Sequence, residues 1–355
     1  MKRFYIFLFA LLLLQLATQA QVYQNEWIDY SKTYYKFKVG KSGVYRIPYT
    51  TLEAAGLNGL NGNGFRLYAR GGKAVPIYVT QTGKLTNNDY IEFYATKNDG
   101  KFDTYLHKNA SEQLSNLKSL FTDTLSYYLV GDVGSNGSWY ANADNSMTGL
   151  PAAENYFMHE VLSFNNNVHS LGDGVKIAGA NYWYADYEPN EGFSGQSILA
   201  PNSLDYNIKT PKRYTDDPDL FAKLETKIVG QTHSIYYNPD HLVDISVGST
   251  KYQTAEFEGY SSIVTSLVVF MTDIKDLTKV SFKALELVGQ NTDYTQSVSV
   301  VYNKLTYPRK FDFDNSKVFK FALGDQNEKY LAITNFDEGT TPVLYDLTNQ
   351  IRMVP

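Results

Sequence analysis

The histidines are the side chains with the clearest potential for metal chemistry. The chain has five of them: His107, His159, His169, His233 and His241. His159 is followed by Glu160, which is how the zinc motif His-Glu-x-x-His begins on a helix. The position of the second histidine is Ser163, however, and the segment alternates like a strand. His169 follows ten residues after His159, within an asparagine-rich turn. We therefore expect His159 on a strand face and predict no metal site here.

Nucleophilic catalysis would need an activated serine or cysteine. The chain has no cysteine, so it offers neither a thiolate nucleophile nor a thiolate metal ligand. Residues 192–196 read GFSGQ and come close to the nucleophile elbow Gly-x-Ser-x-Gly. The second glycine is one position early, and no helical pattern follows, although the elbow joins a strand to a helix. The sequence does not predict a serine hydrolase.

Two clusters of oxygen-bearing side chains leave a choice between a turn and a calcium site. Asn98, Asp99 and Asp103 surround Gly100, and calcium accepts such ligands. The later glutamate of a full calcium loop is missing, so a simple Asx–Gly turn is the favoured interpretation. The acidic residues of segment 216–219 are interpreted first as a solvated turn, with calcium as the alternative.

The sequence also leaves open whether the chain hydrolyses or binds carbohydrate. Glycosidases need two carboxyl groups roughly 5–10 Å apart, and 37 acidic residues give sequence alone no means of choosing a pair. Five aromatic residues could stack on a sugar ring or simply alternate along strands: Trp139, Tyr140, Tyr182, Trp183 and Tyr184. The sequence thus predicts no catalytic, cofactor-binding or metal-binding residue, and no cofactor.

The first 20 residues predict export. Two positive charges, Lys2 and Arg3, precede an apolar run that is too short to span a membrane and ends in small residues. We expect cleavage after Ala20, leaving 335 residues without a lipid-accepting cysteine and without a second long apolar run. Loss of the two cations changes the formal charge from −5 to −7, which argues against nucleic acid as a partner. We expect the mature chain to work outside the cytoplasm.

The first part of the mature chain, 21–150, alternates polar and apolar residues with period two. Segments 32–39 and 44–47 flank a glycine turn and predict a hairpin, and a short helix capped by Thr50 and Glu53 follows and ends at Gly56. A second helix is expected near 111–120. Further strands are expected at 65–69, 75–80, 89–95 and 126–130. Segment 131–150 is rich in Gly, Asn, Asp and Ser and predicts the domain boundary.

The second part, 151–310, predicts longer strands. These are expected at 155–164, 181–187, 220–230, 242–247, 252–258, 263–270, 279–288 and 297–305. Few helix signals accompany them, so we predict an all-β chain whose second domain is a jelly-roll-like sandwich. Segment 261–271 is the most apolar of the mature chain and is expected as a central strand. Segment 311–355, with strand-like stretches at 318–323, 330–334 and 343–347, is expected as a lead-in to a further domain downstream.

Several short segments, in order, resemble a known family. The first are YKFKV at 35–39, GVYRI at 43–47 and LEAAG at 52–56. FRLY at 65–68, DYIEFY at 89–94 and FTDT at 121–124, leading into YYL at 127–129, continue the order. VYNKLTYPR at 301–309 completes it. Together they resemble the N-terminal region of gingipain-type cysteine peptidases, most closely the branch that serves as sortase of the type IX secretion system.

The resemblance implies a location and a context rather than a reaction. The location is the periplasm, the outer-membrane surface or the exterior. In that family these segments belong to a non-catalytic, β-rich region, and the His–Cys pair lies in a later domain. The implied partners are a downstream peptidase domain or proteins of the envelope secretion machinery. The alternative is a secreted β-sandwich that binds glycan or a cell-surface partner.

Overall fold

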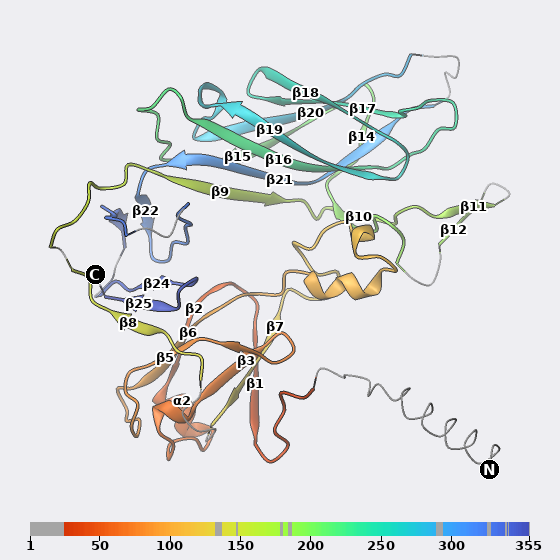
Figure 1. Cartoon of the computed structure of the whole chain (residues 1–355). Coiled ribbons are helices and arrows are strands. Elements are labelled where there is room, and N and C mark those ends of the chain that lie inside the picture. The colour runs from red at the N-terminus through yellow and green to blue at the C-terminus, as the bar shows by residue number, and fades with distance from the viewer. Residues whose placement is uncertain are drawn as a thin grey trace, which may run out of the picture. The chain divides into compact units, whose positions relative to one another are not determined.

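The structure is a computed structural model of the chain, and strands dominate it (Figure 1). It describes residues 25–354 except 132–136, 147, 178–179, 184–186, 289–293, 325–327, 338 and 340. The export segment, Tyr184 and part of the expected 181–187 strand therefore lie outside the described residues. The prediction of an all-β chain is confirmed. The described part of the chain has no helix with the length and apolar character that a membrane crossing requires.

The chain divides into two compact units. Unit 1 comprises the described residues of Met1–Lys97, Thr124–Ala143 and Leu344–Met353. Unit 2 comprises those of Asn98–Asp123, Asp144–Val343 and Val354–Pro355. Each unit therefore combines segments that lie far apart in the sequence.

Unit 1 contains three small sheets, with the strand orders β1-β7-β3-β4, β2-β6-β5 and β24-β25-β8. The four strands of the first sheet are β1 (Tyr34–Val39), β7 (Leu125–Val130), β3 (Arg66–Ala69) and β4 (Lys73–Val75). The second sheet consists of β2 (Gly43–Pro48), β6 (Tyr90–Ala95) and β5 (Ile77–Val79). The third consists of β24 (Leu344–Asp346), β25 (Ile351–Met353) and β8 (Ala141–Ala143).

The hairpin predicted from 32–47 is wrong, although both strands exist. β1 pairs with β7, and Val39 lies opposite Leu125. β2 instead pairs with β6 in the second sheet, where Tyr45 lies opposite Phe93. The glycine turn therefore carries the chain from one sheet to another, because both strands find apolar partners far along the sequence.

The predicted first helix is present as α2 (Tyr49–Ala54), but its caps differ from expectation. Pro48 occupies the N-cap position and no side chain caps the helix, so the Thr50–Glu53 capping box is wrong. Gly56 does close it, with a positive φ of 75° and its N–H on the carbonyl of Glu53. The second predicted helix, 111–120, is also wrong. Only the short 3-10 turn η3 (Ala110–Glu112) overlaps it, after the turn η2 (Lys101–Leu106), because Gln113, Ser115 and Ser119 side chains bond to nearby backbone instead.

The core of unit 1 combines buried aliphatic side chains with a cluster of aromatic rings. Phe93 on β6 is 1% exposed, and its ring centroid lies 5.9 Å from Phe37, 6.0 Å from Tyr45 and 6.1 Å from Tyr127. Beside it on β6, Glu92 is 4% exposed and pairs with Arg46 at 2.7 Å. The Glu92 carboxylate also lies 3.6 Å from Arg352 and accepts a hydrogen bond from Tyr345.

Unit 2 contains a sandwich of two antiparallel sheets (Figure 1). The five-stranded sheet consists of β14 (Ile198–Leu199), β21 (Ser297–Arg309), β16 (Phe221–Gly230) and β19 (Ser262–Phe270), in that order, with β9 (Phe157–Phe164) also on β21. The four-stranded sheet consists of β15 (Ser203–Lys209), β20 (Leu277–Ala284), β17 (His241–Val247) and β18 (Thr250–Phe257). Numbered from β14 to β21, these orders interleave early and late strands as a jelly roll does, which confirms the predicted fold.

Small elements complete unit 2. They are β10 (Val168–Ser170), β13 (Gly192–Ser194), β11 (Val175–Ile177), β12 (Ala180–Tyr182), β22 (Asp312–Ser316), β23 (Thr334–Phe336) and the 3-10 turn η4 (Met271–Asp273). β15 and most of these small strands were not predicted from the sequence. The strand expected at 318–323 does not form, because its aromatic residues pack into a cluster of rings instead of a ladder.

The sandwich core is mainly aliphatic. Leu224 on β16, Val243 and Ile245 on β17, Val280 on β20 and Val300 on β21 are all 0% exposed. Along β16 and β17 the buried residues alternate with exposed or half-buried positions, the pattern from which these strands were predicted, whereas the first five residues of β21 are all buried.

β19 corrects the expectation of a central strand at 261–271. It stands at the end of the strand order and pairs with β16, whereas β16 and β21 occupy the centre of the sheet. Val264, Val268 and Phe270 point away from the core and are 53%, 67% and 55% exposed. The segment is apolar on both faces, but only one face is buried.

Candidate functional site

His159 lies on a strand face, as predicted. It belongs to β9 opposite Tyr307 of β21, and its ring stacks on Phe319 with 5.4 Å between centroids. Burial, assisted by the nearby charge of Arg309, lowers the pKa of His159 to about 4. A half-buried, uncharged imidazole among aromatic rings is a packing residue.

The other two histidines of the N-terminal half are also dispersed. His169 lies on β10 opposite Phe193, with its Nε2 atom 3.8 Å from Glu191. His107 follows η2 and is 7% exposed, and burial lowers its pKa. Neither joins a larger group of metal-capable side chains in the part of the chain that the structure describes.

The GFSGQ segment does not form a nucleophile elbow. Residues 192–194 form strand β13, and the extended stretch that follows leads into β14 without a helix. Ser194 is 0% exposed and its hydroxyl donates to the carbonyl of Gly195 at 3.4 Å. Its hydroxyl therefore has no access to a substrate.

The two acidic clusters fold as turns stabilised by the chain's own donors. Asn98 and Asp99 accept the N–H groups of Gly100 and Lys101, and Gly100 has a φ of 78°. Asp103, 6% exposed, accepts hydrogen bonds from the backbone of Leu120 at 2.6 Å and from Ser119. In the second cluster, Asp217 accepts the N–H of Asp219 at 2.9 Å. Both segments have the Asx geometry that the turn interpretation predicts.

Four of the five aromatic candidates are among the described residues, two in each unit. Trp139 lies in unit 1 under Arg66, whose guanidinium is 5.4 Å from the indole ring. Tyr140, 7% exposed, packs its ring on Tyr345. Tyr182 and Trp183 belong to unit 2 and are 55% and 45% exposed, so they remain available to a ligand.

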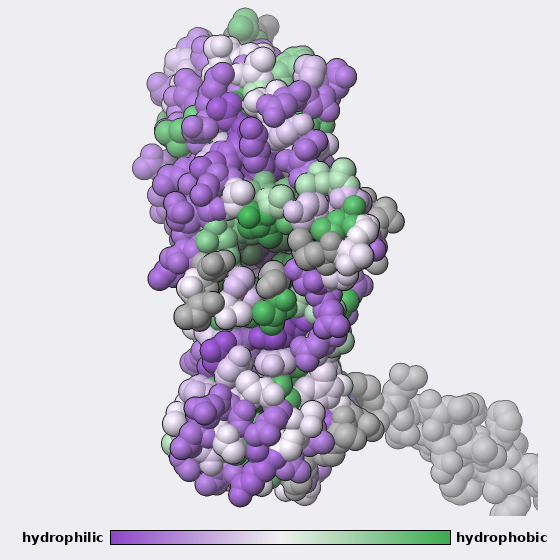
Figure 2. All heavy atoms as spheres, turned by 90° about the vertical axis from the view of Figure 1, so that its left-hand side faces the viewer, coloured by the Kyte–Doolittle hydropathy of each residue, from purple (hydrophilic) through white to green (hydrophobic). Residues whose placement is uncertain are grey.

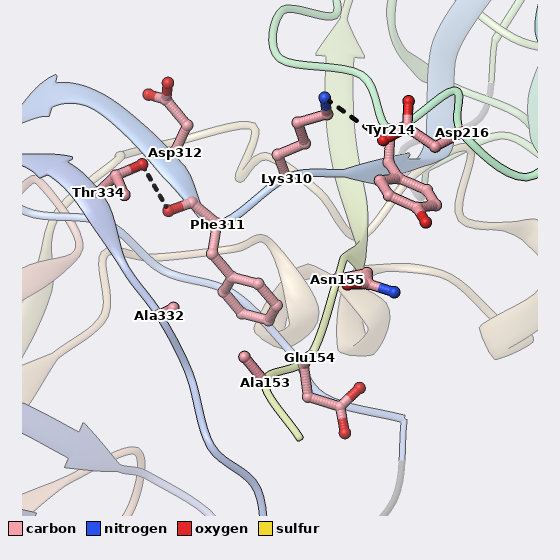
Figure 3. A pocket seen from close by; sticks show the side chains of 10 residues that line it. All are labelled: Ala153, Glu154, Asn155, Tyr214, Asp216, Lys310, Phe311, Asp312, Ala332 and Thr334. Atoms are coloured by element: carbon pink, nitrogen blue, oxygen red, sulfur yellow. Dashed lines mark hydrogen bonds and ion pairs between the residues drawn. The ribbon is translucent and has the colours of Figure 1, made fainter.

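A groove that the sequence did not suggest lies beside the sandwich in unit 2. Its volume is about 380 Å³, and it is lined by Ala153, Glu154, Asn155, Tyr214, Asp216, Lys310, Phe311, Asp312, Ala332 and Thr334 (Figure 3). Four segments distant in sequence meet here, held by backbone hydrogen bonds. Glu154 bonds to the carbonyl of Tyr330, Tyr214 to that of Pro308, and Thr334 to that of Phe311.

An aromatic cluster forms the base of this groove. Phe311 belongs to a cluster with Phe157 and Phe313, each no more than 4% exposed. The ring of Tyr214 stacks on Tyr156 with 5.1 Å between centroids. On the face shown in Figure 2 the sandwich is mostly hydrophilic, and hydrophobic residues gather below it, at the level of β22.

The carboxylates of the groove are paired with lysines. Glu154 lies 2.8 Å from Lys329, Asp216 lies 3.9 Å from Lys310, and Asp312 lies 2.9 Å from Lys212. Burial acts to raise the pKa of Asp312, but hydrogen bonds from Lys212, Asp314 and Asn335 outweigh it and hold that pKa below its ordinary value. The groove thus offers charged acceptors, an amide and a ring edge to a ligand, and its lining has no histidine, serine or cysteine.

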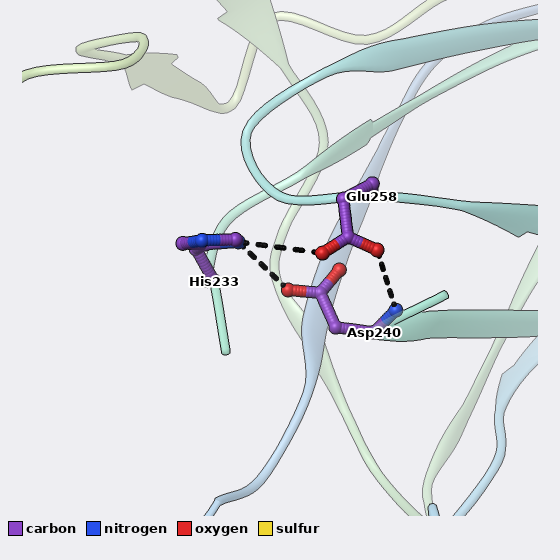
Figure 4. Close-up of side chains that lie close together, drawn as sticks. All are labelled: His233, Asp240 and Glu258. Atoms are coloured by element: carbon purple, nitrogen blue, oxygen red, sulfur yellow. Dashed lines mark hydrogen bonds and ion pairs between the residues drawn. The ribbon is translucent and has the colours of Figure 1, made fainter. Parts of the chain in front are cut away.

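One group of three metal-capable side chains lies together among the described residues: His233, Asp240 and Glu258 (Figure 4). Their nearest ligand atoms all lie within 4.8 Å of one another. No spacing in the sequence pointed to them, because His233 and Glu258 are brought together only by the pairing of β17 with β18.

Comparisons with known proteins give structural likenesses only. No model of a protein family matches the sequence, and no curated protein matches it. The chain is similar to a dimeric latent PorU from Porphyromonas gingivalis, with 14% identity and a TM-score of 0.45. That match covers 81% of this chain and 26% of the other, so this chain spans about a quarter of that protein's length.

Two carbohydrate-binding modules are similar over a smaller part. One is the CBM36-1 domain of a multidomain xylanase from the hindgut metagenome of Trinervitermes trinervoides, with 11% identity, a TM-score of 0.24, and coverage of 41% of this chain and 96% of the module. The other is a CBM36 module in complex with calcium and xylotriose, with 9% identity, a TM-score of 0.22, and coverage of 41% and 98%. Because these likenesses are weak, the class of this protein has to be argued from its own residues.

Proposed function

We propose that this chain is the non-catalytic, β-rich N-terminal region of an exported protein of the gingipain-like, type IX sortase-related kind. It acts by packing against a peptidase domain or by presenting that domain to partners at the cell envelope. Catalysis by a His–Cys pair would belong to the partner domain, because this chain has no cysteine.

The observation that carries the proposal is where the family-like segments lie. Segments 35–39, 43–47, 65–68 and 89–94 coincide with β1, β2, β3 and β6, which form the core of unit 1. Segment 301–309 lies in β21, a central strand of the sandwich. Most of the resemblance therefore resides in residues that build the fold, as a scaffold role requires, and none of it lies in the lining of the groove.

The outer face of β19 is the surface we assign to the partner. β19 is an edge strand, and Val264, Val268 and Phe270 expose apolar side chains on it, with Phe221 of β16 beside Phe270 at 5.8 Å between rings. Exposed apolar patches on edge strands are common interaction sites.

Binding to the downstream domain tests the proposal. DNA beyond the codon for Pro355 is expected to continue into a domain that contains His and Cys, and that domain is expected to bind purified residues 21–355. Val264→Lys combined with Val268→Lys should weaken this binding at least about tenfold. Leu277→Lys, an equally exposed apolar position on β20, is the matched control and should leave it unchanged.

Enzymatic activity of the isolated chain would contradict the proposal. We expect no peptide hydrolysis by purified residues 21–355 and no effect of thiol reagents. Turnover of a peptide or a glycoside by the pure chain, or a reading frame that closes at Pro355 without a partner, would contradict the proposal. N-terminal sequencing of the exported protein should begin at Gln21.

A glycan-binding role is the second candidate, and the groove at Tyr214 favours it. Rings flanked by carboxylates and amides are typical of sites for hydroxyl-rich ligands. A glycan array should then show saturable binding that Tyr214→Ala abolishes. Loss on Trp183→Ala instead would place the site at that exposed indole, which does not line the groove. Tyr236→Ala, at a 70% exposed tyrosine outside the groove, is the control. Absence of saturable binding would leave the scaffold role alone.

A further inference from the structure

We propose that His233, Asp240 and Glu258 form a binding site for a divalent transition-metal ion of the Zn²⁺ type, which joins two loops at one end of the sandwich. His233 and Asp240 belong to the loop between β16 and β17, and Glu258 follows β18 (Figure 4). The site is separate from the groove and from the face of β19, and it does not depend on the proposed function.

The spacing of the three donors suits a small ion. His233 Nδ1 lies 3.1 Å from Asp240 Oδ2 and 3.9 Å from Glu258 Oε1. Ligands on a tetrahedral ion with bonds of about 2.1 Å are about 3.4 Å apart, a distance that these two values bracket. One imidazole nitrogen with two carboxylate oxygens is a donor set for Zn²⁺, Co²⁺ or Ni²⁺ rather than for Ca²⁺, which prefers oxygen alone. Three protein ligands leave a fourth position for water.

The carboxylates are held in place before any ion binds. Asp240 is 0% exposed, and it accepts the N–H of Ser234 on Oδ2 and the N–H of Gly259 on Oδ1, both at 2.7 Å. Glu258 accepts the N–H of Asp240 at 3.2 Å through Oε2, which leaves Oε1 facing His233. Such supporting hydrogen bonds are typical of metal sites, where they orient the ligands.

Gly259 provides the room that the imidazole needs. It has a φ of 58°, and a Cβ atom there would lie 3.1 Å from His233 Nδ1. A side chain at this position would crowd the nitrogen that the ion requires. The sharp turn at Gly259 therefore serves both the carboxylate and the histidine.

The charge of the cluster is the second, independent argument. Within the described residues, neither Asp240 nor Glu258 forms an ion pair with a lysine or an arginine, and their only ion-pair partners are His233 and His241. A carboxylate without exposure is costly unless a cation compensates it. A divalent ion would supply that charge, and the side chains of His233 and Glu258, 42% and 40% exposed, give it access from solvent. The competing explanation is a protonated His233 between the two carboxylates.

Metal titration separates these explanations. Tag-free residues 21–355, freed of metal with a chelator, should bind one Zn²⁺ per chain in calorimetry, with affinity that falls as pH is lowered because protons compete with the ion for its ligands. Co²⁺ should give the visible bands of a four-coordinate ion. His233→Ala and Glu258→Gln should each weaken binding by at least about 10–100-fold.

A matched control guards against adventitious binding. His169→Ala removes another partly exposed histidine that faces a single carboxylate, Glu191, and should leave the affinity unchanged. Thermal unfolding of each metal-free variant checks that it is folded. Absence of stoichiometric Zn²⁺ binding by the folded parent chain, or binding that His233→Ala and Glu258→Gln leave intact, would overturn the proposal.

Discussion

The cores of the two units are stabilised in different ways. Unit 1 has strands of three to six residues, and its core joins buried aliphatic side chains to a ring cluster that includes Phe37, Tyr45, Phe93 and Tyr127. The sandwich of unit 2 has strands of up to 13 residues and fills its interior mainly with Val, Ile and Leu. A short strand offers few inward positions, so a ring at one of them adds buried apolar area that a small side chain could not. A long strand can reach the same buried area with many smaller side chains.

Removing one ring from each core gives the largest expected effect. Phe93→Ala in unit 1 and Phe282→Ala in unit 2 should each lower the free energy of unfolding by about 3–5 kcal/mol, because both side chains are at most 1% exposed. Hydrogen exchange should show the loss of protection around β6 in the first variant and around β20 in the second. Phe270→Ala, at a 55% exposed ring, should change stability by no more than about 0.5 kcal/mol. Equal losses in all three variants would contradict the burial assigned to the two core rings.

The buried charge network of unit 1 gives the next largest effect. Glu92→Gln should cost about 3 kcal/mol, because it leaves Arg352, 7% exposed, without its anionic partner. Urea unfolding measures the loss. Lys251→Ala breaks an ion pair with Asp244 that is as short as the Arg46–Glu92 pair, 2.7 Å. Because the lysine side chain is 53% exposed, a loss of about 0–1 kcal/mol is expected. A smaller loss for Glu92→Gln than for Lys251→Ala would show that the network is not buried in solution.

The two cores also differ in how far the sequence predicted them. Alternation revealed most strands of the sandwich, because a strand buried on one face has to alternate. It could not reveal pairing: β1 and β2 are neighbours in sequence, yet each pairs with a distant strand whose apolar face matches. β19 misled the prediction because its outward residues are as apolar as its inward ones.

The candidate sites were harder to predict than the strands. The groove combines residues near 154, 214, 311 and 334, and the metal-capable group combines 233, 240 and 258. Neither set has a spacing that any motif prescribes, since tertiary contacts alone bring the members together. The sequence could exclude motifs whose residues are neighbours in the chain. Ser163 in place of a second histidine excluded the zinc motif, and this residue lies in β9. The missing glycine at 196 excluded the nucleophile elbow, and the residues before it form β13.

A pair of leucine substitutions separates ring–ring contact from burial. Phe93→Leu and Phe282→Leu remove similar apolar area, but Phe93 has three ring neighbours near 6 Å and Phe282 has Tyr206 at 5.7 Å. Because a ring pair contributes about 0.5–1.5 kcal/mol beyond its area, Phe93→Leu should cost about 1 kcal/mol more. Urea unfolding of both variants measures the difference, and equal costs would mean that the rings of unit 1 act only through the area they bury.

The smallest expected effect is a pH dependence confined to one unit. All five histidines lie in unit 2, so unit 1 has no side chain of this type to titrate in mild acid. The pKa of His159 is about 4 in the fold, lowered chiefly by burial, against about 6.5 when unfolded. Between these values the unfolded state binds the proton more readily, so the contribution of neutral His159 is complete above about pH 6.5 and is lost as pH falls toward 4.

His159→Phe isolates this effect, because the new ring keeps the contacts with Phe157 and Phe319. Urea unfolding at neutral pH and at about pH 5, with each transition assigned to a unit by pulsed hydrogen exchange, should show a pH-dependent loss of stability for unit 2 that the variant reduces. A smaller slope should persist in the variant, since burial also lowers the pKa of His107. An equal slope in unit 1 would mean that carboxylates dominate this pH range, and the presence of histidines in unit 2 alone would then have no consequence in mild acid.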